Sequence, residues 1–282
     1  MDANLEASTM KKVYLYILPL TMIMYFLCYI DRINVSFAAL TMNKDIGLDA
    51  WTYGISSTAF YIGYVVFEVP SNLWMEKFGA RLWLARIMIT WGLASMATAA
   101  VVGPTSFLII RLILGIGEAG LFPGMLLMFS YWFPDRHRAR IVGSFTLALP
   151  ISVALGAPIS TAILDMDGIW GIKGWQWIYI IEALPTVIVG FFVLFVLIDG
   201  PQQAKFLTQA EKDWLTSTLA RERKQIETGG TYTIWQSMTN PKMLLLAVNY
   251  LGIVTASLGL LYFASLIFKD LGANKDTIGR AV

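Results

Sequence analysis

Residues that commonly bind metals or act as nucleophiles are almost absent from this sequence. Of its 282 residues, one is a cysteine, Cys28, and one is a histidine, His137. A single cysteine excludes a disulfide within the chain and a thiolate metal site. The histidine falls in a predicted loop and not beside a nucleophile, and we interpret it as a solvated residue instead of a proton relay. We therefore expect no metal, no cofactor and no enzymatic activity.

Charged residues are also scarce. They make up 14% of the chain, against 57% hydrophobic residues, and the mean hydropathy is +0.62. A water-soluble domain of this size needs a more polar surface, whereas a multi-pass membrane protein requires such a balance. The formal net charge of +2 gives no indication of a nucleic-acid partner. The composition predicts an integral, multi-pass membrane protein surrounded by a lipid bilayer.

Seven segments are long and apolar enough to cross a bilayer, which takes about 20 residues in a helix. We place them at residues 13–40, 52–75, 82–101, 105–128, 140–163, 175–198 and 242–267. Because lipid offers the backbone no hydrogen-bond partners, each span should be helical and the fold class all-α. The first run, from Val13, is too long for a cleavable signal peptide, so we expect it to stay as a membrane anchor.

A long polar stretch between the sixth and seventh spans predicts how the chain is divided. Residues 1–198 would form a six-helix bundle, residues 199–240 a linker, and residues 241–282 the start of a second bundle. Inside the linker, Thr208 to Glu211 matches the capping-box pattern of a helix start, and Gly229–Gly230 would end that helix. Its apolar side consists of Trp214, Leu215 and Leu219. We expect this helix to lie along the cytoplasmic membrane surface.

Lysine and arginine are distributed unequally between the two sides of the predicted spans. With a cytoplasmic N-terminus, 14 of the 21 lie on that side, 5 lie on the opposite side, and Arg32 and Arg111 lie within spans. Cytoplasmic loops carry an excess of these residues. The bias predicts a cytoplasmic N-terminus and, if the source is bacterial, residence in the cytoplasmic (inner) membrane.

Two adjacent charges interrupt the first span. The segment Tyr25–Phe37, YFLCYIDRINVSF, places Asp31 beside Arg32. Each charge would cost roughly 2.5 to 3.5 kcal/mol at a bilayer centre, so both should face protein or a water-filled cavity. A guanidinium offers two parallel donors to a carboxylate, which makes Arg32 our candidate for binding an anionic substrate. Tyr29 and Tyr64 would add hydroxyl groups to this site.

The fourth span carries a second pair of charges in RLILGIGEAGLFPG. Arg111, Gly115 and Glu118 are spaced i, i+4 and i+7, so they share one helix face. We predict Asp31 and Glu118 as proton carriers. Burial favours the neutral form of a carboxyl while a nearby arginine favours the charged form, so a substrate that competes for the arginine changes proton affinity. Arg111 would be the internal partner of Glu118.

Each of these residues has a structural alternative. Asp31 and Arg32 could neutralise each other, although adjacent helical residues point about 100° apart. Arg111 with Glu118 could be a structural ion pair, and Tyr64 could equally pack as bind a ligand.

The fifth and sixth spans carry features that we interpret as structural. Small residues recur every four positions at Ser144, Ala148, Ser152, Gly156 and Ser160, which predicts close helix packing. Pro150 and Pro158 should kink the same helix. Glu182 lies about one turn inside the sixth span, near the membrane surface.

The loop after the second span crowds charge and glycine into six residues. The residues concerned are Glu76, Lys77, Gly79 and Arg81. Their order, an acid followed by a base, a spacer, a glycine and then bases, resembles the signature loop of the major facilitator superfamily. This resemblance implies a role in conformational change. The match is partial, because Asn72 stands where a glycine is usual and Ala80 where the first of two bases is usual.

Motifs along the whole chain narrow this resemblance. CYIDRINVSFA, VPSNLWMEKFGAR, RLILGIGEAGLFPG, YWFPDRHRAR and GWQWIYIIEALP, in this order, resemble the anion:cation symporter family. That family takes up organic anions such as tartrate, phthalate and hexonates, and its arginine beside the first-span aspartate binds the substrate carboxylate. The resemblance implies proton-coupled uptake of a small organic carboxylate, with Arg32 in that role.

The same resemblance predicts a C-terminally truncated member. The family has twelve spans, whereas this chain stops at Val282, where an eighth would begin. Uniport or exchange of organic anions, and a remnant that does not transport, therefore remain alternatives to symport.

Overall fold

The computed structural model describes residues 3–228, 236, 239–272 and 278, and within them helix is the only regular secondary structure. The α-helices are α1 (Ala3–Asp45), α2 (Ala50–Phe78), α3 (Ala80–Ala97), α4 (Pro104–Glu118), α5 (Leu121–Trp132), α6 (Asp135–Thr146), α7 (Ala148–Leu164), α8 (Gly174–Val196), α9 (Gln209–Thr228) and α11 (Pro241–Asp270). Three 3₁₀ turns accompany them: η1 (Thr98–Ala100), η2 (Ile169–Gly171) and η3 (Pro201–Gln203). The predicted all-α fold class is confirmed.

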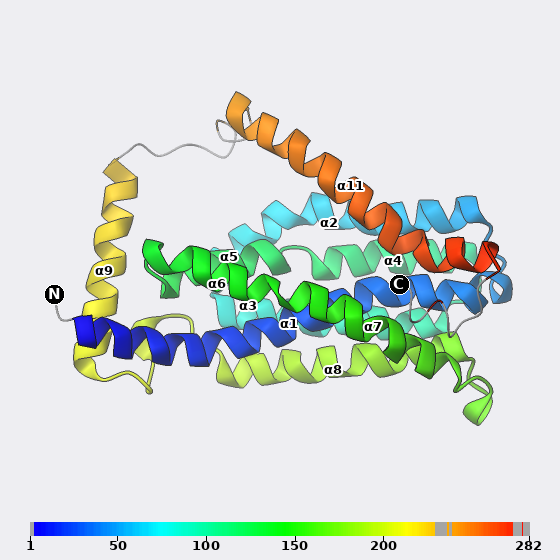
Figure 1. Ribbon diagram of the computed structural model, residues 1–282, viewed down its shortest axis with the longest axis horizontal. Coiled ribbons are helices and arrows are strands. Elements are labelled where there is room, and N and C mark those ends of the chain that lie inside the picture. The colour runs from blue at the N-terminus through cyan, green and yellow to red at the C-terminus, as the bar shows by residue number, and fades with distance from the viewer. Residues whose placement is uncertain (1–2, 229–235, 237–238, 273–277, 279–282) are drawn as a thin grey trace.

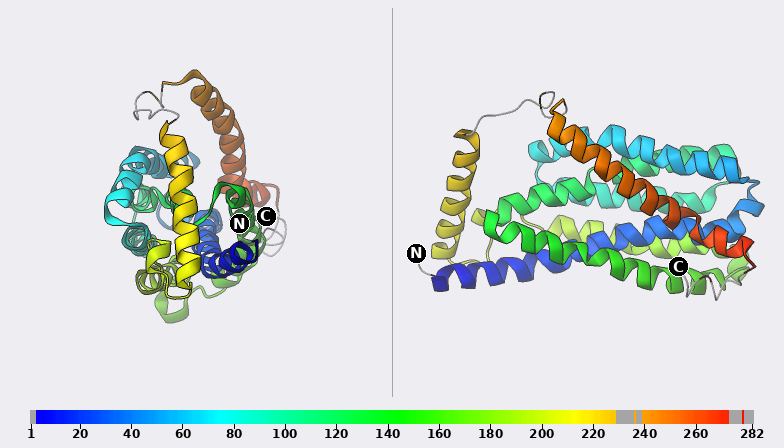
Figure 2. Two further views of the ribbon diagram at one scale, coloured as in Figure 1. Left: turned by 90° about the vertical axis from the view of Figure 1, so that its left-hand side faces the viewer. Right: turned by 45° about the horizontal axis from the view of Figure 1, so that its top comes forward.

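Helices α1 to α8 run along the long axis of the molecule as a bundle (Figure 1). Helix α9 stands across one end of this bundle, as the end-on view also shows (Figure 2). We call this the linker end, and the opposite end, where α1 finishes at Asp45, the far end. Helix α11 crosses the bundle obliquely and packs on α1.

Among the residues that the structure describes, six helical segments are long and apolar enough to cross a membrane. They are Asn4–Asp45, Ala80–Ala100, Pro104–Trp132, Asp135–Leu164, Gly174–Val196 and Pro241–Asp270. The predicted second span is also a helix, the 29-residue α2. It is not one of these six segments, because polar side chains such as Ser56 and Glu68 lower its hydropathy. It packs most extensively against α4, within the bundle.

Two of the predicted spans, 105–128 and 140–163, are each divided into two helices. Helix α4 stops at Glu118, and α5 begins after Gly120, whose φ of +90° suits glycine. The break between α6 and α7 falls at Leu147, three residues before Pro150. Proline removes a backbone donor and crowds the preceding turn, which explains a break at this position.

Small residues let the helices approach closely. A Cβ on Gly115 would lie 2.0 Å from the backbone oxygen of Phe60, so α4 and α2 touch through their backbones. The ladder of the fifth span also packs as predicted, because Ala148, Ser152 and Ser160 are buried and a Cβ on Gly156 would meet α1. Ser144, at the end of the ladder, is half-buried.

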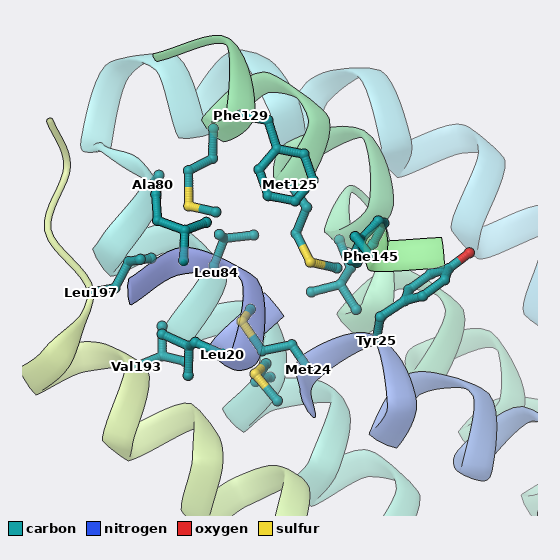
Figure 3. Close-up of a cluster of buried hydrophobic side chains, with 14 of the residues drawn as sticks. Leu20, Met24, Tyr25, Ala80, Leu84, Met125, Phe129, Phe145, Val193 and Leu197 are labelled. Atoms are coloured by element: carbon teal, nitrogen blue, oxygen red, sulfur yellow. The ribbon is translucent and has the colours of Figure 1, made fainter. Parts of the chain in front are cut away.

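A large apolar cluster fills the linker half of the bundle (Figure 3). Its labelled members are Leu20, Met24 and Tyr25 of α1, Ala80 and Leu84 of α3, Met125 and Phe129 of α5, Phe145 of α6, and Val193 and Leu197 of the α8 region. The close packing of side chains from five helices gives the bundle a fixed frame on which charged groups can be held.

The linker helix α9 is attached to the bundle by charge and by apolar contact. Glu211 accepts hydrogen bonds from Lys12 at 2.8 Å and from Ser8 at 2.8 Å. It also accepts from the backbone nitrogen of Thr208, which confirms the predicted capping box. Leu215 is fully buried against the bundle, so part of the apolar side meets protein. Gly229–Gly230, predicted to end α9, lie outside the described residues.

His137 differs from the prediction of a solvated loop residue. It lies in the first turn of α6, its side chain is only 18% exposed, and its Nε2 is 3.1 Å from Glu6 Oε1. Packing of α6 against α1 places it at this contact, which the sequence pattern did not indicate.

Candidate functional site

The centre of the candidate site is an ion pair between α1 and the end of α4. Arg32 Nε donates to Glu118 Oε1 at 2.9 Å, and Arg32 Nη2 is in even closer contact with the same oxygen. Cys28 Sγ, one turn earlier on α1, lies 3.3 Å from that oxygen. The second carboxylate oxygen, Oε2, is buried without a hydrogen-bond partner. Glu118 is 0% exposed, whereas 13% of the Arg32 side chain is accessible.

Aromatic rings surround the guanidinium of Arg32. The centres of the Tyr64 and Tyr29 rings lie 5.3 and 5.4 Å from its Cζ atom, and the Phe60 ring lies at 6.0 Å. Such distances allow cation–π attraction, which stabilises the charge without using its hydrogen-bond donors. Arg32, Tyr29 and Tyr64, predicted from the sequence to act together, are therefore brought together by the fold.

Asp31 faces a different direction from Arg32. Its Oδ2 accepts from Trp91 Nε1 at 2.7 Å, and its Oδ1 accepts from Ser95 Oγ and, at 3.2 Å, from Asn34 Nδ2. Trp91 and Ser95 are one turn apart on α3, so this helix presents two neutral donors to one buried carboxyl. The alternative that Asp31 and Arg32 neutralise each other is not observed, because Arg32 pairs with Glu118.

Arg111 is fully buried but does not pair with Glu118 in this structure, contrary to the prediction. Its Nη2 donates to the hydroxyl of Tyr262 on α11 at 2.9 Å. Its Cζ lies 4.9 Å from the centre of the Phe60 ring. Although Arg111 and Glu118 share a helix face, α1 supplies a nearer cation to Glu118, and α11 supplies a hydroxyl to Arg111.

The loop between α2 and α3 depends on Gly79. Its φ is +90°, and a Cβ there would lie 2.8 Å from the Asp199 Oδ1 atom. The same Asp199 oxygen accepts from the backbone nitrogen of Arg81 at 2.8 Å and so caps the start of α3. Glu76 and Lys77 lie in the last turn of α2 with exposed side chains. These loop residues are at the linker end, away from Arg32.

Several residues of the site were not predicted. They are Cys28, Asn34, Phe60, Trp91, Ser95 and Tyr262. A weak indication existed for Trp91 and Ser95, whose i, i+4 spacing puts an indole and a hydroxyl on one face of an apolar span. No local pattern indicates Tyr262, because its contact with Arg111 joins residues 151 positions apart.

Comparison with known proteins agrees with this architecture. A family model described as Major Facilitator Superfamily matches residues 21–279. A putative tartrate transporter of Agrobacterium vitis is 43% identical over 98% of this chain and 61% of its own length. The inner membrane transport protein RhmT of Escherichia coli is 38% identical over 93% of this chain and 61% of its own length.

Solved structures show the same fold. A bacterial homologue of the human lysosomal transporter Spinster superimposes with a TM-score of 0.74 at 16% identity, over 95% of this chain and 58% of that protein. The chain spans about three fifths of the length of the tartrate-transporter and RhmT relatives. Because the family model covers almost the whole sequence, the chain belongs to the Major Facilitator Superfamily.

Proposed function

We propose that this chain supplies the N-terminal bundle of a transporter that takes up a small organic carboxylate together with protons. The observation that carries the proposal is the Arg32–Glu118 pair, a partly accessible cation neutralised by a fully buried acid. The similarity to putative tartrate transporters supports a carboxylate substrate, as does the resemblance to the anion:cation symporter family. The protein would act as a transporter and not as an enzyme.

Competition for Arg32 couples the two ligands in this proposal. Among the described residues, the guanidinium of Arg32 is the only cation paired with Glu118. A substrate carboxylate that accepts two parallel hydrogen bonds from this guanidinium displaces the Glu118 carboxylate from it. Glu118 would then be buried without a counter-charge, which favours its neutral, protonated form. The unpartnered Oε2 atom is available to hold that proton. Substrate and proton therefore bind together, while Asp31 is proposed as a second proton carrier.

The other predicted residues have supporting roles in this proposal. Tyr29 and Tyr64 would line the substrate position beside Arg32. Arg111 would act through Tyr262, joining the first bundle to α11. The α2–α3 loop would serve as a hinge between conformations, and the linker end, rich in lysine and arginine, would face the cytoplasm.

Uptake into proteoliposomes tests the proposal. The product of the complete open reading frame is reconstituted, and uptake of radiolabelled tartrate is measured with and without an inward proton gradient. We expect gradient-driven accumulation that Arg32→Lys abolishes, since lysine lacks the two parallel donors. Glu118→Gln should stop accumulation and leave tartrate exchange intact. Arg221→Lys, on the exposed side of α9, should behave as wild type.

Each remaining outcome favours one alternative. Uptake that ignores the proton gradient would identify a uniporter or an exchanger. Absence of any organic-anion binding would favour a remnant that does not transport. Accumulation unchanged in Glu118→Gln would remove this residue from the coupling mechanism.

A further inference from the structure

Glu182 is a buried carboxyl that the proposed mechanism does not use. It lies eight residues after the start of α8 at Gly174, which is about 12 Å along the helix axis. It is therefore about two turns from the start of the helix, where the sequence suggested one, and it is only 5% exposed. A carboxyl at this depth needs partners for both oxygens.

The surroundings of Glu182 offer neutral hydrogen-bond donors but no counter-charge. Ser160 Oγ of α7 donates to Glu182 Oε1 at 2.7 Å, but Oε2 is buried with no partner. No ion pair involving Glu182 occurs in the described part of the chain. The charged group that acts on it is the Asp31 carboxyl of α1, which has the same sign, while the groups of α7 and α1 that contact it are neutral. An ionised carboxyl in such a place costs several kcal/mol.

A neutral amide is shared between the two carboxyls. The Asn34 side chain is close enough to act on Glu182 as a hydrogen-bond donor, and its Nδ2 atom donates to Asp31 Oδ1 at 3.2 Å. One neutral amide cannot offset two buried negative charges, and Glu182 Oε2 remains buried without a partner in the described structure. The neutral acid is thus the form of lower free energy at Glu182.

We propose that Glu182 is a proton-binding site, held as the neutral acid and connected to Asp31 through Asn34. The bound ligand is a proton, and loss of that proton would place a second negative charge beside Asp31. This site is separate from the Arg32–Glu118 pair, and it does not depend on which substrate the transporter carries.

Infrared spectroscopy of the purified chain in lipid nanodiscs tests the proposal. Near pH 7, exposed carboxyls with pKa values of about 4 are ionised, so the carbonyl band of a protonated carboxylic acid reports buried neutral groups. We expect this band in the wild type and its loss in Glu182→Gln. Glu76→Gln, at an exposed position of α2, should keep the band. Because glutamine has nearly the volume of glutamate and keeps an oxygen that can accept from Ser160, Glu182→Gln should fold with an unchanged circular dichroism spectrum.

Other outcomes would overturn the proposal. These are a wild type without the band, or a band that survives Glu182→Gln and disappears in Asp31→Asn. Ser160→Ala provides a second measurement, since removal of the hydroxyl from Oε1 should shift the band to higher frequency, and an unchanged frequency would contradict the assignment. Failure of the tartrate uptake test leaves these spectra unaffected, so the two proposals fail independently.

Discussion

A double-mutant cycle on Arg32 and Glu118 tests whether their contact is an ion pair that the fold depends on. Glu118→Gln leaves the Arg32 charge without a counter-charge, and removing one partner of a buried pair costs about 3–5 kcal/mol. This cost is reduced because 13% of the Arg32 side chain is accessible and because glutamine keeps an oxygen that can accept from Arg32. We therefore expect Glu118→Gln to lower the free energy of unfolding by about 2–3 kcal/mol. Arg32→Met leaves the fully buried carboxylate unpaired and should cost about 3 kcal/mol.

The double variant Arg32→Met/Glu118→Gln removes both charges. Replacement of a buried pair by neutral groups of similar volume is often close to neutral, so we expect a loss of about 1 kcal/mol. The coupling free energy between the two positions should therefore be about 4–5 kcal/mol. In a chain of this size each kcal/mol lowers Tm by about 2–4 °C. The double variant should melt several degrees above either single variant.

The assay is thermal unfolding in nanodiscs, followed by tryptophan fluorescence. If the two single losses simply add up in the double variant, the contact contributes no pairing energy and the reasoning is refuted.

Three further predictions concern stability. Gly115→Ala should lower the free energy of unfolding by about 1–3 kcal/mol, because its Cβ would lie 2.0 Å from a backbone oxygen of α2. In the control Gly54→Ala, the added Cβ would meet nothing within 4 Å, so this variant should melt no lower than wild type. Burial alone would raise the pKa of Glu211, but the hydrogen bonds from Lys12 and neighbouring groups outweigh it and lower that pKa to about 2. The stabilisation by Glu211 is therefore complete above about pH 5 and lost as pH falls through about 2, so the Tm deficit of Glu211→Gln should vanish in acid; a constant deficit would contradict this. Tyr262→Phe removes the hydroxyl that accepts from the buried Arg111. Chemical denaturation should show a loss of about 1–3 kcal/mol in the free energy of unfolding. An unchanged free energy would show that the contact is weak.

Local and compositional properties made much of this protein predictable. Runs of apolar residues separated by short polar turns dictate helices, because a lipid environment leaves the backbone no other way to satisfy its hydrogen bonds. The capping box at Thr208 and the small-residue ladder around Ser152 also follow from nearest neighbours on a helix. Asp31, Arg32 and Glu118 were identifiable because charge is costly in an apolar span.

Only the tertiary structure decided which of these charges meet. The sequence places Glu118 on the same helix face as Arg111, but the Arg32 side chain of α1 reaches the end of α4 and becomes its partner. The depth of Glu182 and its approach to Asn34 likewise depend on how α8 packs against α1 and α7. Helical periodicity sets which residues share a face, whereas the partner of a buried charge is set by the neighbouring helix that faces it, and that neighbour is distant in the sequence.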